Sequence, residues 1–149
     1  MRAVIQRCAS ARVLVHGEEA AAIGAGLVAF VAAGRGDGPA DVRYMAAKIA
    51  GLRVFEGEDG RMALGPRQAA AAILLVPQFT LYGDVRRGLR PDFTAAAPPE
   101  AGRALLADLA AALRAMGLPV AEGRFGAHMR VEVAGDGPVT ILVDSARAF

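Results

Sequence analysis

The 149-residue sequence contains one cysteine, two histidines, one lysine and no tryptophan. Cys8 has no second cysteine with which to pair, so an internal disulfide is excluded and a reducing, cytoplasmic location is favoured. His16 and His128 lack the spacing of metal ligands, and we expect neither a metal nor another cofactor. No apolar run approaches the roughly 20 residues that cross a bilayer, and the first residues do not resemble a signal peptide. These absences exclude a membrane protein, a secreted mini-domain and a zinc finger.

The composition favours a folded domain with a substantial core. Hydrophobic residues make up 54% of the chain and charged residues 21%, whereas a disordered chain is more polar. The net charge is +2, which is too small to identify a nucleic-acid-binding protein by itself. The length suits one domain, and there is no internal repeat or linker, so we expect residues 1–149 to form a single domain.

Apolar patterns along the chain predict a β-rich fold. Alternating apolar and polar positions near the start of the chain are typical of half-buried strands, and continuous apolar runs further on indicate buried strands. Glycine-rich turns are expected to join the last strands. The prediction is an α+β fold with about seven or eight strands and two main helices. The predicted strands include residues 2–8, 11–16, 27–33, 72–76, 129–133 and 139–143.

Two helices are predicted from apolar residues that recur at steps of three and four. The first begins at Pro39, with Asp37 where a cap is expected, and the second begins near Pro99 and ends at Gly117. Their predicted buried faces are Val42, Met45, Ala46, Ile49 and Leu52 in the first helix, and Ala101, Leu105, Leu109, Leu113 and Met116 in the second.

A long loop is predicted between residues 83 and 99, which contain two glycines and three prolines and show no periodicity. Loops of this length in compact domains are usually functional or mobile. Arg86, Arg87 and Arg90 lie in this loop. They are candidates for contacts with phosphate groups, and the alternative is a solvated loop without such a role.

Two segments break the strand pattern with residues that can bind a ligand. Pro77–Leu81 places an amide, an aromatic ring and a hydroxyl directly after an apolar strand, where they form either a plain strand end or a site. Gly135–Thr140 contains a Gly-Pro peptide, which adopts the cis form at a cost of only about 0.5–1 kcal/mol. This segment is either a simple hairpin turn or a turn whose main-chain carbonyls face a ligand. Cys8 has apolar neighbours in a predicted strand, which favours a core position over catalysis.

Four segments resemble a known family when they are taken together. They are Met1–Arg7, Gln78–Leu81, Gly123–Ala127 and Asp136–Thr140, which read MRAVIQR, QFTL, GRFGA and DGPVT. In this order, and over nearly the whole chain, they resemble the D-aminoacyl-tRNA deacylases.

The resemblance implies a homodimer with each active site at the subunit interface. It implies hydrolysis of the ester that joins a D-amino acid, or glycine mischarged on an alanine tRNA, to the 3′ end of tRNA. This activity proofreads chirality during translation. In the family, a cis Gly-Pro peptide enters the pocket of the other subunit, where its carbonyls leave no room for an L side chain. Here the peptide is Gly137–Pro138, and Arg7 matches the arginine that supports it.

The same resemblance implies roles for other residues. Gln78, Phe79 and Thr80 are the expected catalytic segment, which holds the terminal adenosine and the reacting carbonyl group. Phe125 and Met129 are expected to flank the pocket. Amides near Phe79 and Thr80 would stabilise the oxyanion while the ribose 2′-hydroxyl transfers the proton, and the alternative is direct attack by Thr80.

Two positions depart from the family pattern. Pro77 stands where the family usually has serine, and Gly135 stands where it usually has asparagine. A related subfamily, with a trans Gly-Pro peptide, resembles this chain in having proline at the first position. One alternative is therefore a deacylase of that type, acting on mischarged L-alanyl-tRNA. A second alternative, of a different class, is a non-catalytic RNA-binding module whose Gly-Pro turn is only structural.

Overall fold

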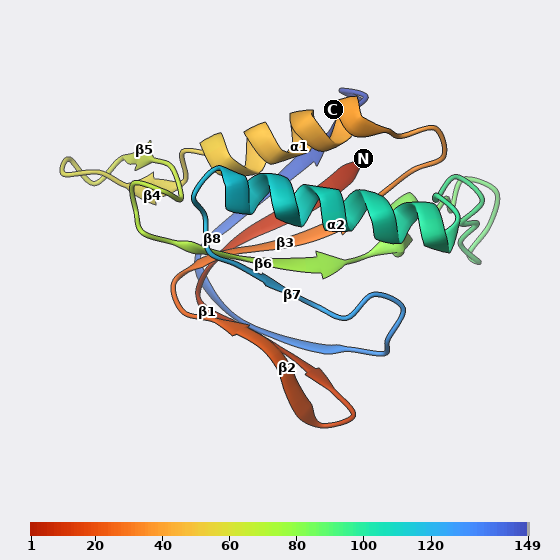
Figure 1. Cartoon of the computed structure of the whole chain (residues 1–149), viewed down its shortest axis with the longest axis horizontal. Coiled ribbons are helices and arrows are strands. Elements are labelled where there is room, and N and C mark those ends of the chain that lie inside the picture. Colours follow the sequence, from red (N-terminus) through yellow and green to blue (C-terminus); the bar gives the residue numbers. More distant parts are fainter. Residues whose placement is uncertain (149) are drawn as a thin grey trace.

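The computed structural model describes residues 1–148 and contains two α-helices, one short 3-10 helix and eight strands (Figure 1). Six strands form one sheet in the order β2-β1-β3-β6-β7 with β8 paired to β1, and β4 and β5 form a separate hairpin. The predicted α+β class is confirmed. No helix in the described chain is long and apolar enough to span a membrane. The elements are β1 (Arg2–Val15), β2 (Glu18–Ile23), β3 (Gly26–Ala32), α1 (Pro39–Gly51), β4 (Phe55–Glu56), β5 (Met62–Leu64), β6 (Ala72–Pro77), η1 (Phe79–Tyr82), α2 (Pro99–Ala115), β7 (Val120–Glu122) and β8 (Arg130–Asp144).

The first two predicted strands form one continuous strand, β1, which corrects the prediction. One edge of β1 pairs with β8 along nearly its whole length, and the other edge pairs first with β3 and then with β2. Ala9 and Ser10 are exposed and break the apolar alternation. At this point the pairing with β8 shifts register, and the strand does not end.

The last two predicted strands also form one strand, β8, so the predicted glycine-rich turn between them is wrong. Both halves of β8 are antiparallel to β1, and the chain therefore keeps its direction through the Gly-Pro segment. Cys8 pairs with Gly135 and Gln6 pairs with Thr140. Between these two pairs, β1 has one residue, Arg7, whereas β8 has the four residues Asp136–Val139. These four residues form a bulge in β8.

Parallel pairing of β3, β6 and β7 places the carboxyl ends of these strands at one edge of the sheet. β3 pairs with β6 from Gly26–Ala72 to Val31–Pro77, and β6 pairs with β7. Parallel neighbours need a crossover connection, and the chain makes these crossovers through α1 and α2.

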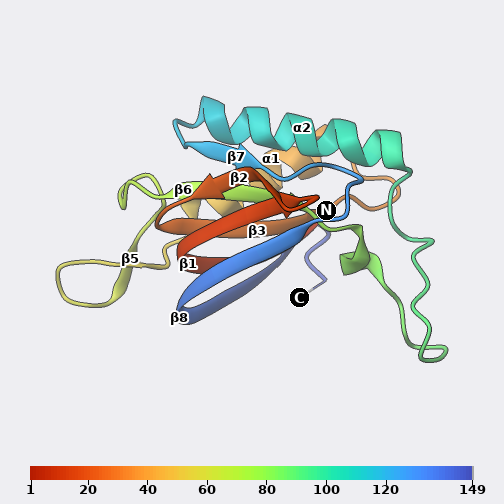
Figure 2. The ribbon, with the colours of Figure 1, turned by 90° about the horizontal axis from the view of Figure 1, so that it is seen from below.

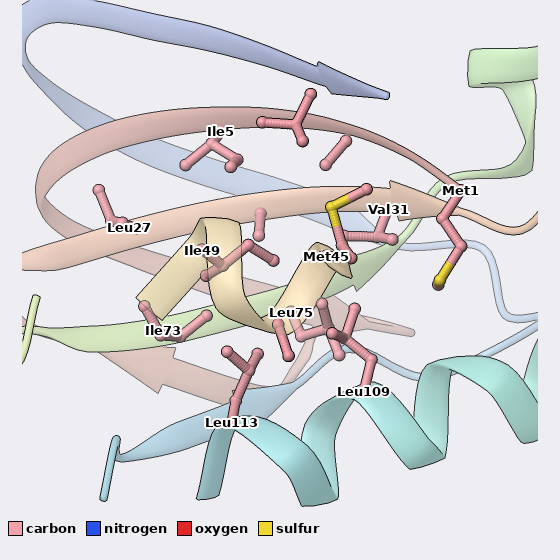
Figure 3. Packing of buried hydrophobic residues seen from close by; sticks show 14 of the residues in the cluster. Met1, Ile5, Leu27, Val31, Met45, Ile49, Ile73, Leu75, Leu109 and Leu113 are labelled. Carbon is pink, nitrogen blue, oxygen red and sulfur yellow. The ribbon is translucent and has the colours of Figure 1, made fainter. Parts of the chain in front are cut away.

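Both helices cover the same face of the sheet, and the main core lies between them and the strands (Figures 1 and 2). Met45 and Ile49 of α1 and Leu109 and Leu113 of α2 are fully buried there, beside Ile73 of β6 (Figure 3). A smaller cluster on the other face includes Cys8, Val13, Val28, Leu74 and Val76.

The predicted helix faces are correct in α1 and partly wrong in α2. In α1, four of the five predicted residues are buried, from Val42 to Ile49. In α2, Ala101 and Met116 are exposed, because the buried stripe runs instead through Gly102, Leu106, Leu109, Ala110 and Leu113. Glycine and alanine belong to this stripe because the helix packs closely at those positions, which hydrophobicity alone does not reveal.

The residue that caps α1 is Gly38, and the prediction of Asp37 as the cap is wrong. The Asp41 carboxylate accepts a hydrogen bond of 2.9 Å from the Gly38 amide and so satisfies a group at the helix start. Asp37 faces the end of β3, where its carboxylate accepts a 2.5 Å hydrogen bond from the Gly34 amide.

Candidate active site

A cavity of about 620 Å³ opens at the carboxyl ends of β3 and β6. Its walls come from these strand ends, the start of η1, residues 93–99 with the beginning of α2, and the segment between β7 and β8. The carboxyl ends of parallel strands are a common place for ligand sites, and sites for small molecules have volumes of roughly 300–1,000 Å³. Of the residues predicted from the sequence, Gln78, Phe79, Phe125 and Met129 line this cavity.

The predicted catalytic segment lies where β6 ends and η1 begins. Pro77 has no amide hydrogen, and the next amide, that of Gln78, donates to the carbonyl of Val31 at 2.8 Å. The Gln78 side-chain amide donates to the hydroxyl oxygen of Thr80. Thr80 is thereby fixed beside the cavity but does not line it.

Two main-chain amides at the start of η1 are free. The first amides of a helix have no carbonyl partner inside the helix. Within residues 1–148, the N–H groups of Phe79 and Thr80 make no hydrogen bond, whereas the amides of Leu81 and Gly83 do. The free amides are therefore available to an electronegative atom of a ligand.

A polar cluster fixes the other end of η1 to the sheet. The Arg2 guanidinium lies 4.5 Å from the centroid of the Tyr82 ring, donates to the carbonyl of Leu81 at 3.2 Å and pairs with Asp144 at 3.1 Å. Burial, and next the Asp37 carboxylate, raise the pKa of the Tyr82 phenol above its ordinary value, so the hydroxyl stays protonated. Arg2 and Tyr82 thus hold the segment that carries Phe79 and Thr80.

Close packing at Gly34 depends on the absence of a side chain. A Cβ atom placed there would lie 2.5 Å from the Tyr82 hydroxyl oxygen. Tyr82 can therefore lie over the end of β3 only because residue 34 is glycine.

Aromatic residues from separate parts of the chain meet at the cavity. Phe79 is 59% exposed, and its ring centroid lies 5.2 Å from that of Phe93, edge to face. Phe125 packs against α2, where a Cβ atom at Gly102 would lie 3.5 Å from its ring. His128 also lines the cavity. The sequence analysis did not select Phe93, because a single phenylalanine in a segment without periodicity carries no signal.

Three other predicted residues lie outside the cavity, in the bulge of β8 and opposite it. Arg7 is buried, its Nε donates to the carbonyl of Asp136 at 3.1 Å, and its Nη1 donates to the carbonyl of Val54 at 2.5 Å. Gly137 and Pro138 are exposed, and the peptide bond that joins them is cis, as the resemblance implies. Arg7 lies opposite the beginning of β3, whereas the cavity opens at the end of that strand. One chain therefore does not bring the bulge to its own cavity.

Gly137 has a conformation that favours glycine. Its φ is +134°, and a Cβ atom there would lie 2.7 Å from the amide nitrogen of Val139. A Cβ atom placed at Gly135 would meet no other atom within 4 Å. Gly137 in the bulge and Gly135, which directly precedes the bulge, therefore differ sharply in their tolerance of a side chain.

Cys8 is a buried core residue, as predicted. Its side chain is almost fully buried, and desolvation raises the pKa of the thiol above its ordinary value. A thiol of this kind is a poor nucleophile, because the reactive species is the thiolate.

A small α+β domain with a cavity at the ends of parallel strands, lined by aromatic and polar side chains, has the features of a protein that binds a small ligand group. A sequence model of the family described as D-Tyr-tRNA(Tyr) deacylase matches residues 4–144. The D-aminoacyl-tRNA deacylase of Heliobacterium modesticaldum is 55% identical over 144 residues, which cover 97% of this chain and 96% of that protein. That of Thermotoga petrophila is 50% identical over 149 residues, which cover 100% of both chains. The chain belongs to the D-aminoacyl-tRNA deacylase family, which is a family of hydrolases.

Two solved structures share the fold. One, named c-Myc DNA Unwinding Element Binding Protein, has a TM-score of 0.91 and 37% identity, covering 97% of this chain and 98% of that one. The other, described as a probable eukaryotic D-amino acid tRNA deacylase, has a TM-score of 0.79 and 18% identity, covering 95% and 97%. The second likeness supports the fold alone.

We expect Tyr82→Leu to loosen η1 more than Tyr82→Phe does. Phenylalanine keeps the ring that the Arg2 guanidinium contacts, an interaction worth about 0.5–2 kcal/mol, whereas leucine removes it. Hydrogen exchange of the Leu81 and Gly83 amides should therefore accelerate strongly in Tyr82→Leu and little in Tyr82→Phe. Exchange in α1 serves as the internal control. Equal exchange of these amides in the two variants would contradict the role given to the ring.

Proposed function

We propose that this chain hydrolyses the ester bond of D-aminoacyl-tRNA and of glycine mischarged on an alanine tRNA, releasing the amino acid and the tRNA. Such a reaction removes wrong aminoacyl groups before translation and takes place in the cytoplasm without a cofactor. Family membership over the whole chain supports the reaction class. The structural observation that carries the proposal is the position of Gln78 and Phe79 in the wall of a cavity of about 620 Å³, with the free amide of Phe79 and that of its neighbour Thr80 at the start of η1.

The site is completed by a second copy of the chain. Gly137 and Pro138 are exposed and lie at the opposite end of β3 from the cavity of their own chain. An exposed bulge, held rigidly by a buried arginine, is suited to enter a cavity of another molecule. In the homodimer, each cavity receives the bulge of the other subunit, and the bulge forms the wall that faces the Cα atom of the amino acid.

Selectivity for D-amino acids follows from the rigidity of that wall. Main-chain carbonyls cannot move aside when the Arg7 guanidinium holds the neighbouring Asp136 carbonyl. An L side chain would have to occupy the space of these carbonyls, whereas a D side chain points away from them and glycine has no side chain. Rejection by a steric clash is a form of specificity that does not need tight binding of the correct substrate.

The chemical step needs little more than a positioned water and a stabilised oxyanion. The aminoacyl ester is already activated, and water attacks its carbonyl carbon while the free amides of Phe79 and Thr80 bind the developing negative charge. The bond between this carbon and the ribose 3′-oxygen then breaks, and the ribose 2′-hydroxyl relays the proton to the leaving oxygen. The hydroxyl of Thr80 is bound by Gln78, and no basic side chain of residues 1–148 makes a hydrogen bond with it. The proposal therefore gives Thr80 the role of positioning the segment rather than that of the nucleophile.

The function is tested by three substrates that differ only in the group on Cα: D-alanyl, glycyl and L-alanyl esters of the same tRNA. We expect the first two to be hydrolysed, and the L-alanyl ester to react slower by roughly 100-fold, because its methyl group meets the bulge. Rates are measured as release of the amino acid under single-turnover conditions. Preferential hydrolysis of the L-alanyl ester would establish the alternative activity on mischarged L-alanyl-tRNA. Absence of hydrolysis with binding retained would establish the RNA-binding module.

The role of Thr80 is tested by Thr80→Ala, with Thr80→Ser as the matched control that keeps the hydroxyl. If the 2′-hydroxyl of the substrate transfers the proton, the alanine variant keeps a rate within about tenfold of the unchanged protein. A nucleophile behaves differently, since its removal costs roughly 10⁴-fold or more. A loss of that size in Thr80→Ala, with activity retained in Thr80→Ser, would assign direct attack to Thr80.

The role of the bulge is tested by Gly137→Ala against Gly135→Ala. The added Cβ atom at residue 137 would lie 2.7 Å from the amide nitrogen of Val139, whereas at residue 135 it meets nothing within 4 Å. We expect the ratio of D-alanyl to L-alanyl hydrolysis to fall about tenfold or more in Gly137→Ala and to remain high in Gly135→Ala. Circular dichroism verifies that both variants fold. An unchanged ratio in folded Gly137→Ala would show that the bulge does not select chirality.

A further inference from the structure

A second, smaller hollow of about 290 Å³ adjoins the cavity. The two share Pro77, Leu106 and Phe125 in their walls, so that Phe125 stands between them. The smaller hollow is also lined by Arg103 of α2 and by Arg124, which directly precedes Phe125. We refer to it as the Arg103–Arg124 hollow.

The Arg103–Arg124 hollow has a net positive charge. Neither guanidinium forms an ion pair or donates a hydrogen bond in the described part of the chain, and the Arg103 guanidinium lies 4.8 Å from the centroid of the Phe125 ring. Glu122 lines the hollow too, but its carboxylate is paired with Arg114 at 2.6 Å. The acidic group is thereby compensated, and two guanidinium groups remain for a ligand.

This combination of shape and charge fits a phosphate group. The guanidinium presents several N–H donors in one plane, a geometry that matches phosphate oxygens. A ring under the guanidinium limits its motion and leaves its edge free to donate. The volume lies at the lower limit of about 300 Å³ for small-molecule sites, which suits a phosphate with part of a sugar better than a complete nucleoside.

We propose that the Arg103–Arg124 hollow binds the phosphodiester group that immediately precedes the terminal nucleoside of the tRNA 3′ end. This inference rests on the proposed function, in which the terminal aminoacyl nucleoside occupies the larger cavity. An RNA strand that ends in that cavity has its next phosphate just outside it. Phe125 separates the two compartments, so the strand passes over its ring from one to the other.

The arginines of the loop predicted from the sequence are less well placed for this phosphate. Arg86 donates to both oxygens of Asp84, and this contact holds the pKa of that carboxyl well below its usual range. Neither Arg87 nor Arg90 lines the cavity or the Arg103–Arg124 hollow. The segment that carries them extends away from the body of the molecule (Figure 2). Contacts from this loop to more distant parts of the tRNA stay a prediction.

The test compares two synthetic substrates with the same D-amino acid: an ester of adenosine, which has no phosphate, and an ester of the trinucleotide CCA, which has phosphates before the terminal adenosine. In the unchanged protein we expect a higher kcat/KM for the trinucleotide ester than for the adenosine ester. The logarithm of this gain should fall linearly with the logarithm of the salt concentration, with a slope of about −0.7 per phosphate bound. In the double variant Arg103→Gln with Arg124→Gln, the gain should fall by roughly tenfold or more, mainly through KM.

A matched control removes two positive charges elsewhere. Arg43 and Lys48 are exposed on α1, which contributes no residue to the Arg103–Arg124 hollow or the cavity. The variant Arg43→Gln with Lys48→Gln should keep the full gain. An equal loss of gain in both double variants would overturn the inference, because it would reflect the net charge of the protein alone.

Failure of the inference differs from failure of the proposed function. If the unchanged protein hydrolyses the adenosine ester but gains nothing from the phosphates, or if the Arg103 and Arg124 variant keeps the gain, the hollow does not bind this phosphate. If the unchanged protein hydrolyses neither ester nor D-aminoacyl-tRNA, the proposed function is itself wrong.

Discussion

The parallel register of β3 and β6 is the constraint on which the cavity depends. Val31 pairs with Pro77 at the last position of the ladder, so both strands end at the same edge of the sheet. The chain leaving β3 and the chain leaving β6 therefore meet. The Gln78 amide before η1 donates to the carbonyl of Val31, and the last residue of η1, Tyr82, lies over Gly34. Arg2 and Tyr82 then hold η1 in this place. A shift of one residue between the strands would turn the polar side chains after β6 to the other face.

The second constraint is the pairing of β1 with β8, which places the bulge far from the cavity. β8 is paired with β1 both before and after the bulge, and the Gly-Pro segment therefore cannot fold back across the sheet. The Arg7 guanidinium donates to the carbonyls of Asp136 and Val54 and so fixes the bulge to the body of the domain. A single chain thus contains both parts of the proposed site at opposite ends of β3. In the function that we propose, a second copy of the chain is therefore needed to bring a bulge to each cavity.

Much of the fold follows from local patterns, and the two errors in the strands have one cause. Apolar alternation gave the strands and the steps of three and four gave the helices. At Ser10 and at Gly137, however, a break in the pattern was interpreted as the end of a strand. A bulge and a turn use the same residues, and only the partner strand decides between them. In α2, the buried positions include Gly102 because the Phe125 ring approaches there, which is a contact between distant parts of the chain.

The sequence alone determined the fold class, the two helices and the family resemblance, because these depend on local chemistry and on residue order. Tertiary structure alone decided that Phe93 and His128 share the cavity with Phe79, and that Arg103 and Arg124 lie next to it. These residues come from separate elements, and no spacing along the chain encodes their distances. They meet because the packing of α2 and the segment after β7 against the ends of β3 and β6 brings them together.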